Sequence, residues 1–284
     1  MSRRLIIGAL VASLAGCSAL RVGYSQAPQI VHWWLDSYAD FDDSQSARAR
    51  DAIRAWFRWH RSTQLADYAA LLARVEGELA EPLTPAQACR GVDDVNARLA
   101  AAFDRALPAI IDIARTLSPQ QLAHLQQRYA KNNAEYRREF LQDSTEERMR
   151  ESVKRVVERA ESFYGRLDDA QREHIAQWVG DSPFDAQAWF AERKLRQQEV
   201  LQALHRLSTE ALSQEDAQAL LRQVYEHVWR SPREPYRAYQ QRLGQYNCAF
   251  AAQVHNDMSP EQRRRAIAKL KGWEDDLRAL AAGS

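Results

Sequence analysis

Apolar residues recur every three or four positions along most of the chain, which is the period of one face of an α-helix. The stripe is plainest in residues 118–141, 144–165 and 259–281, and no alternating run in the sequence is typical of a strand. The pattern predicts helices at residues 28–40, 44–61, 63–79, 84–90, 92–116, 118–141, 144–165, 168–180, 183–207, 213–230, 234–257 and 259–281. We therefore expect an all-α fold, arranged as a bundle or array of antiparallel helical hairpins.

A short motif recurs where predicted helices begin. In Leu83–Gln87, Leu117–Gln121 and Met258–Gln262, a Ser or Thr is followed by Pro and then, three residues after the Ser or Thr, by Gln. The hydroxyl group can cap the first turn, Pro suits the first helical position, and Gln can bond back to the cap residue. Leu167–Gln171 is a looser copy with Asp as the cap. The motif predicts a capping box at each of these helix starts.

Two features concern how the helices pack. Asn133 interrupts the apolar stripe of residues 118–141. A buried amide needs hydrogen-bond partners, so Asn133 is expected to fix the register of two helices through an interhelical hydrogen bond. Pro183 marks a break between helices, and the domain can divide near residue 180 into two bundles.

The first residues have the pattern of a secretory signal. Arg3 and Arg4 provide positive charge, and an apolar run follows over residues 5–14. This run is too short to span a membrane as a helix, which needs about 20 residues. Small residues and a cysteine follow directly. We therefore expect a signal peptide over residues 1–16.

The stretch Leu14-Ala15-Gly16-Cys17 resembles a bacterial lipobox. In lipoproteins this cysteine becomes the first residue of the mature chain and carries acyl groups, which hold the protein on a bilayer. Ser18 resembles the residue that is typical of the outer-membrane class. The resemblance implies a lipid on Cys17, a tether over residues 17–29 and a helical domain over residues 30–284 on the periplasmic face of the outer membrane. An ordinary signal peptide or a small buried N-terminal segment is the alternative.

Composition narrows the range of partners. The chain has 39 Lys and Arg residues against 38 Asp and Glu residues, and 37 basic residues remain without Arg3 and Arg4. This balance gives no argument for a nucleic-acid partner. The 10 glycines and 9 prolines are few for 284 residues, which favours helices over a turn-rich β fold.

The cysteines allow one disulfide. If Cys17 is lipidated, Cys89 and Cys248 remain as a pair. The periplasm is oxidising, so these two can form a disulfide. The bond would close a loop of about 160 residues and would contribute on the order of 4–5 kcal/mol in the entropic model. Two separate buried thiols are the alternative.

The densest aromatic region gives a candidate binding face. The predicted helix 44–61 carries aromatic residues on one side and arginines beside them. Such a face offers apolar contact and guanidinium groups for an anion such as a carboxylate or a lipid phosphate. The candidate residues are Arg50, Arg54, Arg58, Trp59, His60 and Arg61. A core helix with a solvated arginine flank is the alternative.

Catalytic and metal-binding patterns are scarce in the sequence. His60 could act as a general base with Asp51 or Asp67, which lie near it along the chain. No Ser or Cys nucleophile stands out, and there is no H-E-x-x-H or paired-Cys motif. We therefore expect no enzyme activity, no metal and no cofactor other than the covalent lipid on Cys17.

Several motifs resemble a family of uncharacterised lipoproteins from Gram-negative bacteria that carries a domain-of-unknown-function label. They are Cys17, Tyr24, the Trp34–Tyr38 stretch, Trp59–Arg61, Leu65 with Tyr68, and Met258–Gln262. The resemblance covers nearly the whole mature chain. It implies a helical outer-membrane lipoprotein and supplies no activity.

The helix starts at 83–87 and 117–121 are similar to the LTxxQ motif of the Spy/CpxP-like periplasmic chaperones. Those proteins are small helical cradles that bind unfolded proteins and stress-sensor partners. The resemblance implies a protein-binding or chaperone-like module whose partners are the membrane, through the lipid, and other envelope proteins. A lipoprotein that scaffolds one envelope partner is the alternative, and an enzyme that acts on envelope material through His60 comes third.

Overall fold

The structure is a computed structural model that describes residues 19–142 and 144–283. Within these ranges the chain forms eleven α-helices and no strand, which confirms the predicted all-α fold. The helices are α2 (Ala19–Ala39), α3 (Asp43–Thr63), α4 (Leu65–Glu78), α5 (Pro85–Ala114), α6 (Pro119–Phe140), α7 (Thr145–Tyr164), α8 (Asp169–Gly180), α9 (Ala186–Thr209), α10 (Gln214–Trp229), α11 (Glu234–Asn256) and α12 (Pro260–Ala281). None of the described helices has the length and apolar character needed to cross a bilayer.

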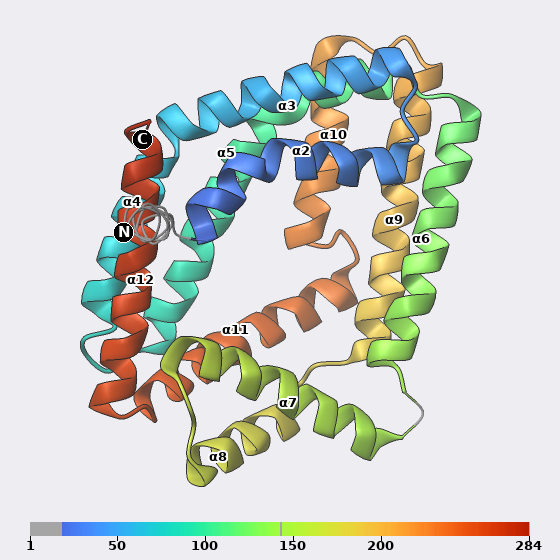
Figure 1. The fold of residues 1–284 in the computed structure, drawn as a ribbon. Helices are drawn as coiled ribbons and strands as arrows, with labels where there is room; N and C mark the ends of the chain where they lie inside the picture. Colours follow the sequence, from blue (N-terminus) through green and yellow to red (C-terminus); the bar gives the residue numbers. More distant parts are fainter. Residues whose placement is uncertain (1–18, 143, 284) are drawn as a thin grey trace, which may run out of the picture.

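The helices are arranged as the sides of a frame (Figure 1). Helix α12 lies along α4, α2 pairs with α3, and α6 pairs with α9. The fourth side holds α7, α8 and α11, and α11 also packs on α5. Because α11 and α12 pack on helices from the first half of the chain, the described residues do not separate into two bundles near residue 180.

Helix α2 begins well before the predicted position. It starts at Ala19, so the expected tether over residues 17–29 is wrong from residue 19 onward. Pro28 lies inside the helix, where a proline removes one backbone hydrogen bond, and α2 is bent (Figure 1). Contacts with α3 hold α2 in place despite this loss, among them a 2.9 Å hydrogen bond between Tyr24 Oη and His60 Nδ1. The expected signal peptide and Cys17 lie outside the described residues.

The capping boxes form as predicted at four helix starts. Each cap side chain accepts a hydrogen bond from the backbone N–H of the Gln three residues on, and that Gln side chain bonds back to the cap N–H. The four caps are Thr84, Ser118, Asp168 and Ser259. A fifth box, formed by Asp42 and Gln45 at the start of α3, follows Phe41 in place of the Leu or Met that precedes the other four caps, and the sequence pattern did not include it.

Four of these glutamines also bond to one another in pairs. Gln45 and Gln121 each donate from Nε2 to the partner's Oε1, over 3.2 and 2.6 Å. Gln171 and Gln262 do the same over 2.8 and 3.0 Å. Each Nε2 also donates to the backbone carbonyl two residues before the partner's cap, as Gln121 does to Asp40. The pairs therefore join the starts of α3 and α6, and of α8 and α12.

Replacing Gln121 by Leu is expected to lower the free energy of unfolding by about 1–3 kcal/mol, because the fully buried Gln45 amide loses a partner. Gln87→Leu is the matched control, since the side chain of Gln87 has hydrogen bonds only to Thr84 among the described residues. Gln87→Leu should lower the free energy of unfolding by less than about 1 kcal/mol, which is the usual loss when a helix cap is removed. Urea unfolding followed by circular dichroism measures both, and equal losses would contradict a special role for the pair.

Apolar side chains gather in two separate cores. The first lies between α5, α9 and α10 and includes Leu107, Ile111 and Leu207. The second lies where α7 and α8 meet Met258, just before α12. The first core is packed against Leu117, which directly precedes the cap of α6, and the second includes Leu167 and Met258, which directly precede the caps of α8 and α12.

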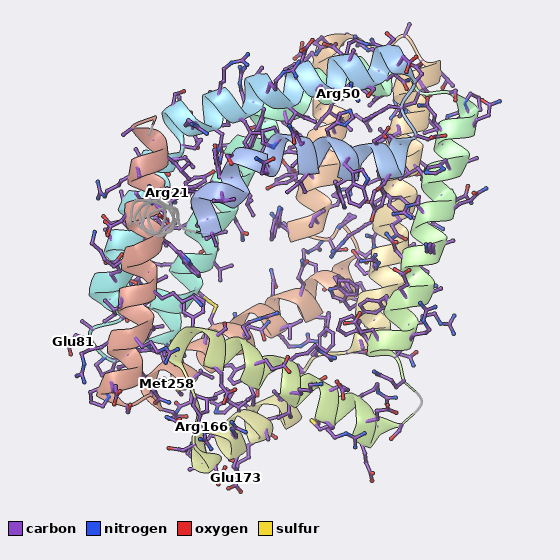
Figure 2. All side chains as sticks on the ribbon, in the orientation of Figure 1. Arg21, Arg50, Glu81, Arg166, Glu173 and Met258 are labelled. Atoms are coloured by element: carbon purple, nitrogen blue, oxygen red, sulfur yellow. A yellow bond between two sulfur atoms is a disulfide. The ribbon has the colours of Figure 1, made fainter. Side chains whose placement is uncertain are left out.

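A disulfide links the two halves of the chain. Cys89 of α5 and Cys248 of α11 are bonded, with an S–S distance of 2.06 Å and Cα atoms 5.3 Å apart. Figure 2 shows this bond between the two helices. The two residues are separated by 159 positions in the sequence, so the bond closes most of the chain into one loop.

Candidate functional site

The candidate face on α3 is divided between the surface and the interior. The residues Arg50, Arg54 and Arg58 follow one another at every fourth position and are exposed (Figure 2 labels Arg50). The residues Trp59, His60 and Arg61 are half-buried. The structure therefore does not gather these six side chains on one binding surface, because the end of α3 turns its aromatic side inward.

His60 lies inside an aromatic cluster. Its ring stacks on Trp56 with centroids 4.7 Å apart, and the ring of Tyr68 meets it edge-on at 5.2 Å. Tyr24 bonds to its Nδ1 atom. Burial lowers the pKa of His60, so the ring is neutral at neutral pH. These contacts favour a role in packing α2 against α3 over a role as general base.

An apolar groove with a volume of about 530 Å³ lies between α2, α6, α9 and the C-terminal part of α5. We call it the apolar groove. Its lining is mainly aromatic and aliphatic and includes Trp34, Leu35, Tyr38, Ile113, Leu117, Leu122, Leu125, Tyr129, Trp189, Val200 and Leu204. Along α9 the lining runs from Trp189 to Leu204, which is about 22 Å at 1.5 Å per residue. An extended peptide of about six or seven residues would span that length.

Aromatic rings form one wall of the apolar groove. The rings of Trp34 and Tyr38 have centroids 4.9 Å apart, and Tyr38 meets Tyr129 at 6.3 Å. Trp34 is still 52% exposed, so its ring has free surface for a ligand. Burial raises the pKa of Tyr129 to about 12, so its hydroxyl group stays neutral and can donate a hydrogen bond. Aromatic faces of this kind bind apolar side chains with little loss of conformational entropy.

Polar groups stand at the end of the groove near Trp189. Arg193 donates from Nε to Asn133 Oδ1 over 3.0 Å, and its guanidinium lies 5.6 Å from the centre of the Trp189 ring. Asn133 donates to Gln197 Oε1 over 2.7 Å, which confirms the predicted bond between helices, here α6 and α9. Arg193 and Arg196 both line the groove, so they offer positive charge to a carboxylate or a peptide carbonyl.

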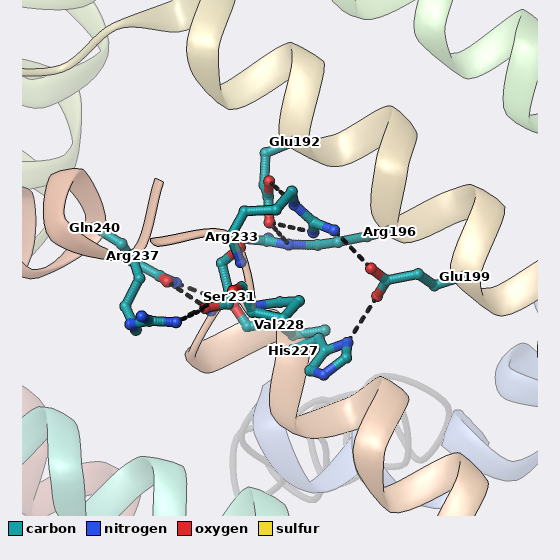
Figure 3. A network of polar contacts seen from close by, with 10 residues as sticks. Glu192, Arg196, Glu199, His227, Val228, Ser231, Arg233, Arg237 and Gln240 are labelled. Atoms are coloured by element: carbon teal, nitrogen blue, oxygen red, sulfur yellow. Dashed lines mark hydrogen bonds and ion pairs between the residues drawn. The ribbon is translucent and has the colours of Figure 1, made fainter. Parts of the chain in front are cut away.

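A network of charged side chains fixes α9 to the segment before α11 (Figure 3). Arg233 donates from Nε and Nη2 to both oxygens of Glu192, over 2.7 and 2.6 Å. It also donates from Nη1 to Glu199 over 2.7 Å, and His227 Nδ1 lies 3.0 Å from the other Glu199 oxygen. Because Glu192 is only 2% exposed, this is a buried ion pair that holds the α9 wall of the groove in place.

The charges of the network determine how its carboxyl groups titrate. Burial raises the pKa of Glu192, but the hydrogen bonds from Arg233 and Ser231 and the charges of Arg233 and Arg196 outweigh it, so the pKa is lowered overall. The same balance lowers the pKa of Glu199, with His227 as a further donor. Both carboxylates are therefore ionised at neutral pH and serve as structural partners of Arg233.

Other regions give weaker candidates. A second cavity of about 870 Å³ lies among α7, α8, α11 and the start of α9, and its lining is more polar, with Arg148, Arg155 and Arg159. Arg155 packs on the ring of Phe140 at 4.7 Å. In the part of the chain that the structure describes, no group of three or more His, Cys, Asp or Glu side chains is placed to hold a metal ion. The apolar groove has the more apolar lining of the two.

The sequence pattern predicts the helices that form the apolar groove but does not indicate the groove itself. Trp189, Arg193, Val200 and Leu204 lie at spacings that place them along one side of α9. The same spacing is typical of a helix face covered by its neighbours. Arg and Gln residues interrupt the apolar stripe of α9. This interruption is the sequence signal that could have indicated a partly open helix face.

Fold and site together define an all-α protein with an open, aromatic groove. The chain belongs to a family of unknown function, DUF6279, whose model matches residues 37–237. This agrees with the expectation of a family that carries a domain-of-unknown-function label, but the match does not extend to Cys17, Tyr24 or Met258–Gln262, on which the expected resemblance also rested. No curated protein and no solved structure matches the chain.

Proposed function

We propose that this protein is a lipoprotein, anchored through Cys17 on the periplasmic face of the outer membrane, that binds apolar segments of other envelope proteins in the apolar groove. The observation that carries the binding role is the groove itself, about 530 Å³ in volume and lined mainly by aromatic and aliphatic side chains. Sites of this kind bind apolar groups and use a few polar residues to orient them. The lipobox-like stretch at residues 14–17 supports the anchor.

The shape and charge of the groove favour a peptide as its ligand. Its length along α9 suits an extended segment of about six or seven residues. Arg193 and Gln197 stand beside the aromatic wall, so a peptide could place its side chains on the rings and its carbonyl groups on these donors. A groove that recognises apolar character and main-chain groups would accept many sequences, which suits a chaperone-like module.

Placing a carboxylate in the groove tests this proposal. The expected result for Val200→Glu is an affinity at least about tenfold lower for a fluorescein-labelled heptapeptide of alternating leucine and serine, because the carboxylate replaces an apolar side chain that the bound peptide would cover. Leu195→Glu is the matched control, since Leu195 is on the same helix, 38% exposed and outside the groove lining. Fluorescence anisotropy measures both affinities. Equal affinities in the two variants would show that the peptide binds elsewhere.

Selectivity separates the two forms of the proposal. A chaperone-like module should bind heptapeptides of different apolar sequence with affinities within about tenfold of one another. A scaffold for one envelope partner should bind one sequence far more tightly than the rest. The second result would keep the groove as the site and replace the chaperone-like role by the scaffold.

A further inference from the structure

One side of α2 exposes large apolar side chains to solvent. Val22, Ile30, Trp33 and Trp34 are 52%, 57%, 68% and 52% exposed. The spacing from Val22 to Ile30 and Trp33 is close to two and three helical turns, so these three lie on the same side of the helix. We call the surface formed by these three side chains and the adjacent, exposed Trp34 the outer face of α2. Exposed groups of this size mark an interaction surface.

The outer face of α2 is also free of charge. Residues 22–35 contain no Asp, Glu, Lys or Arg, although such residues make up 27% of the whole chain. The polar residues exposed among the apolar ones are Ser25, Gln26 and Gln29. A surface of this composition is neutral, with tryptophans next to small polar groups. Tryptophan is enriched at the boundary between lipid headgroups and acyl chains, where one part of the ring is apolar and the N–H can bond to polar groups.

A neighbouring side of α2 is firmly attached to the body of the protein. His32 is buried and bonds through Nε2 to Ser46 Oγ over 3.1 Å. Near the helix start, Arg21 pairs with Asp276 of α12 over 3.2 Å. The outer face is therefore held in a fixed orientation relative to the frame.

The position of α2 in the chain indicates which partner the outer face of α2 contacts. The helix begins at Ala19, two residues after Cys17, which is the residue that the proposed function assigns to the lipid. A lipid on Cys17 brings the start of α2 to the bilayer surface, with no tether long enough to hold it away. An uncharged helix face with two tryptophans gains free energy when it enters the interface.

We propose that α2 lies on the membrane as an interfacial helix, with Val22, Ile30 and Trp33 inserted among the lipids. The proposal rests on the lipid anchor of the proposed function. It fixes how the protein sits on the membrane, and it places the mouth of the apolar groove beside the bilayer, because Trp34 belongs to both surfaces. Apolar segments that emerge at the membrane surface would then meet the groove first.

Quenching of tryptophan fluorescence by brominated lipids tests the proposal. The full-length lipidated protein is reconstituted in phosphatidylcholine vesicles with or without bromine on the acyl chains. Trp33→Phe should reduce the quenched component of the emission, and Trp34, which is also exposed on α2, accounts for what remains. Trp229→Phe is the matched control, because Trp229 is 43% exposed on a different helix, α10, and this variant should keep the quenched component.

The possible results separate docking from anchoring. Equal quenching in the wild type and Trp33→Phe overturns the interfacial helix, even if mass spectrometry finds acyl groups on Cys17. Unmodified Cys17 in protein purified from the membrane overturns the anchor, and quenching with added vesicles then still decides on α2. A dimer in sedimentation analysis that is lost in Trp33→Glu would mean that a second copy covers this face, and would overturn the membrane assignment.

Discussion

Replacing Cys89 and Cys248 together by alanine is expected to lower the free energy of unfolding by about 4–5 kcal/mol. The disulfide joins residues 159 positions apart, and a long closed loop restricts the unfolded chain strongly. It also ties α5 to α11, so without it the two halves of the chain are held by packing and by hydrogen bonds such as those between Asn256 and the Leu83 backbone. Urea unfolding followed by circular dichroism measures the change.

Reduction of the wild-type protein is the control for this prediction. The reduced wild type should unfold at the same urea concentration as the double alanine variant, because both lack the cross-link. The single variant Cys89→Ala should lose as much stability as the double variant. If oxidised and reduced wild type unfold together, the disulfide does not stabilise the fold.

Replacing Arg233 by methionine should lower the free energy of unfolding by about 3–5 kcal/mol at neutral pH. The substitution removes the bidentate partner of Glu192, which is only 2% exposed in the wild type, and leaves Arg196 Nε, 3.5 Å from its oxygen, as the remaining close cation in the described part of the chain. Arg206→Met is the matched control on the same protein. Arg206 pairs with Glu210, both side chains are close to half exposed, and such a pair is worth no more than about 0.5 kcal/mol.

The pH dependence of the free energy of unfolding distinguishes an unpaired charge on Glu192 from a simple loss of packing. Without Arg233, burial should raise the pKa of Glu192, where in the wild type the bonds from Arg233 keep it low. The difference in stability between variant and wild type should therefore shrink as the pH falls and Glu192 becomes protonated in both. A double variant, Glu192→Met with Arg233→Met, should recover most of the loss. A difference that does not change with pH would contradict the buried charge.

The helices could be predicted because they depend on local patterns. The capping boxes placed the starts of α6, α8 and α12 within a residue or two, and the apolar period gave their extent. The pattern failed where contacts between residues distant in the sequence determine the extent of a helix. It divided α5 near Gly91, and it missed the first turns of α2, which are held on α3 and α12.

The candidate site could not be predicted because the same residue types serve in cores and in open grooves. The aromatic run around His60 and the stripe of Trp189, Val200 and Leu204 look alike in sequence. What differs is the neighbour: Tyr24 and Tyr68 cover His60, whereas the stripe on α9 keeps free surface. The same holds for Glu192 and Arg233, which lie 41 positions apart, and for the paired glutamines. These contacts depend on the path of the whole chain.

Site-specific photocrosslinking in cells tests the central claim, which is that the apolar groove binds segments of other envelope proteins. The lipidated protein carries a photoreactive phenylalanine either at Leu204, in the groove, or at Leu195, which is exposed on the same helix outside it. We predict covalent adducts with several envelope proteins through apolar segments at Leu204, and few at Leu195. Equal labelling at the two positions, or none at Leu204, would contradict the account.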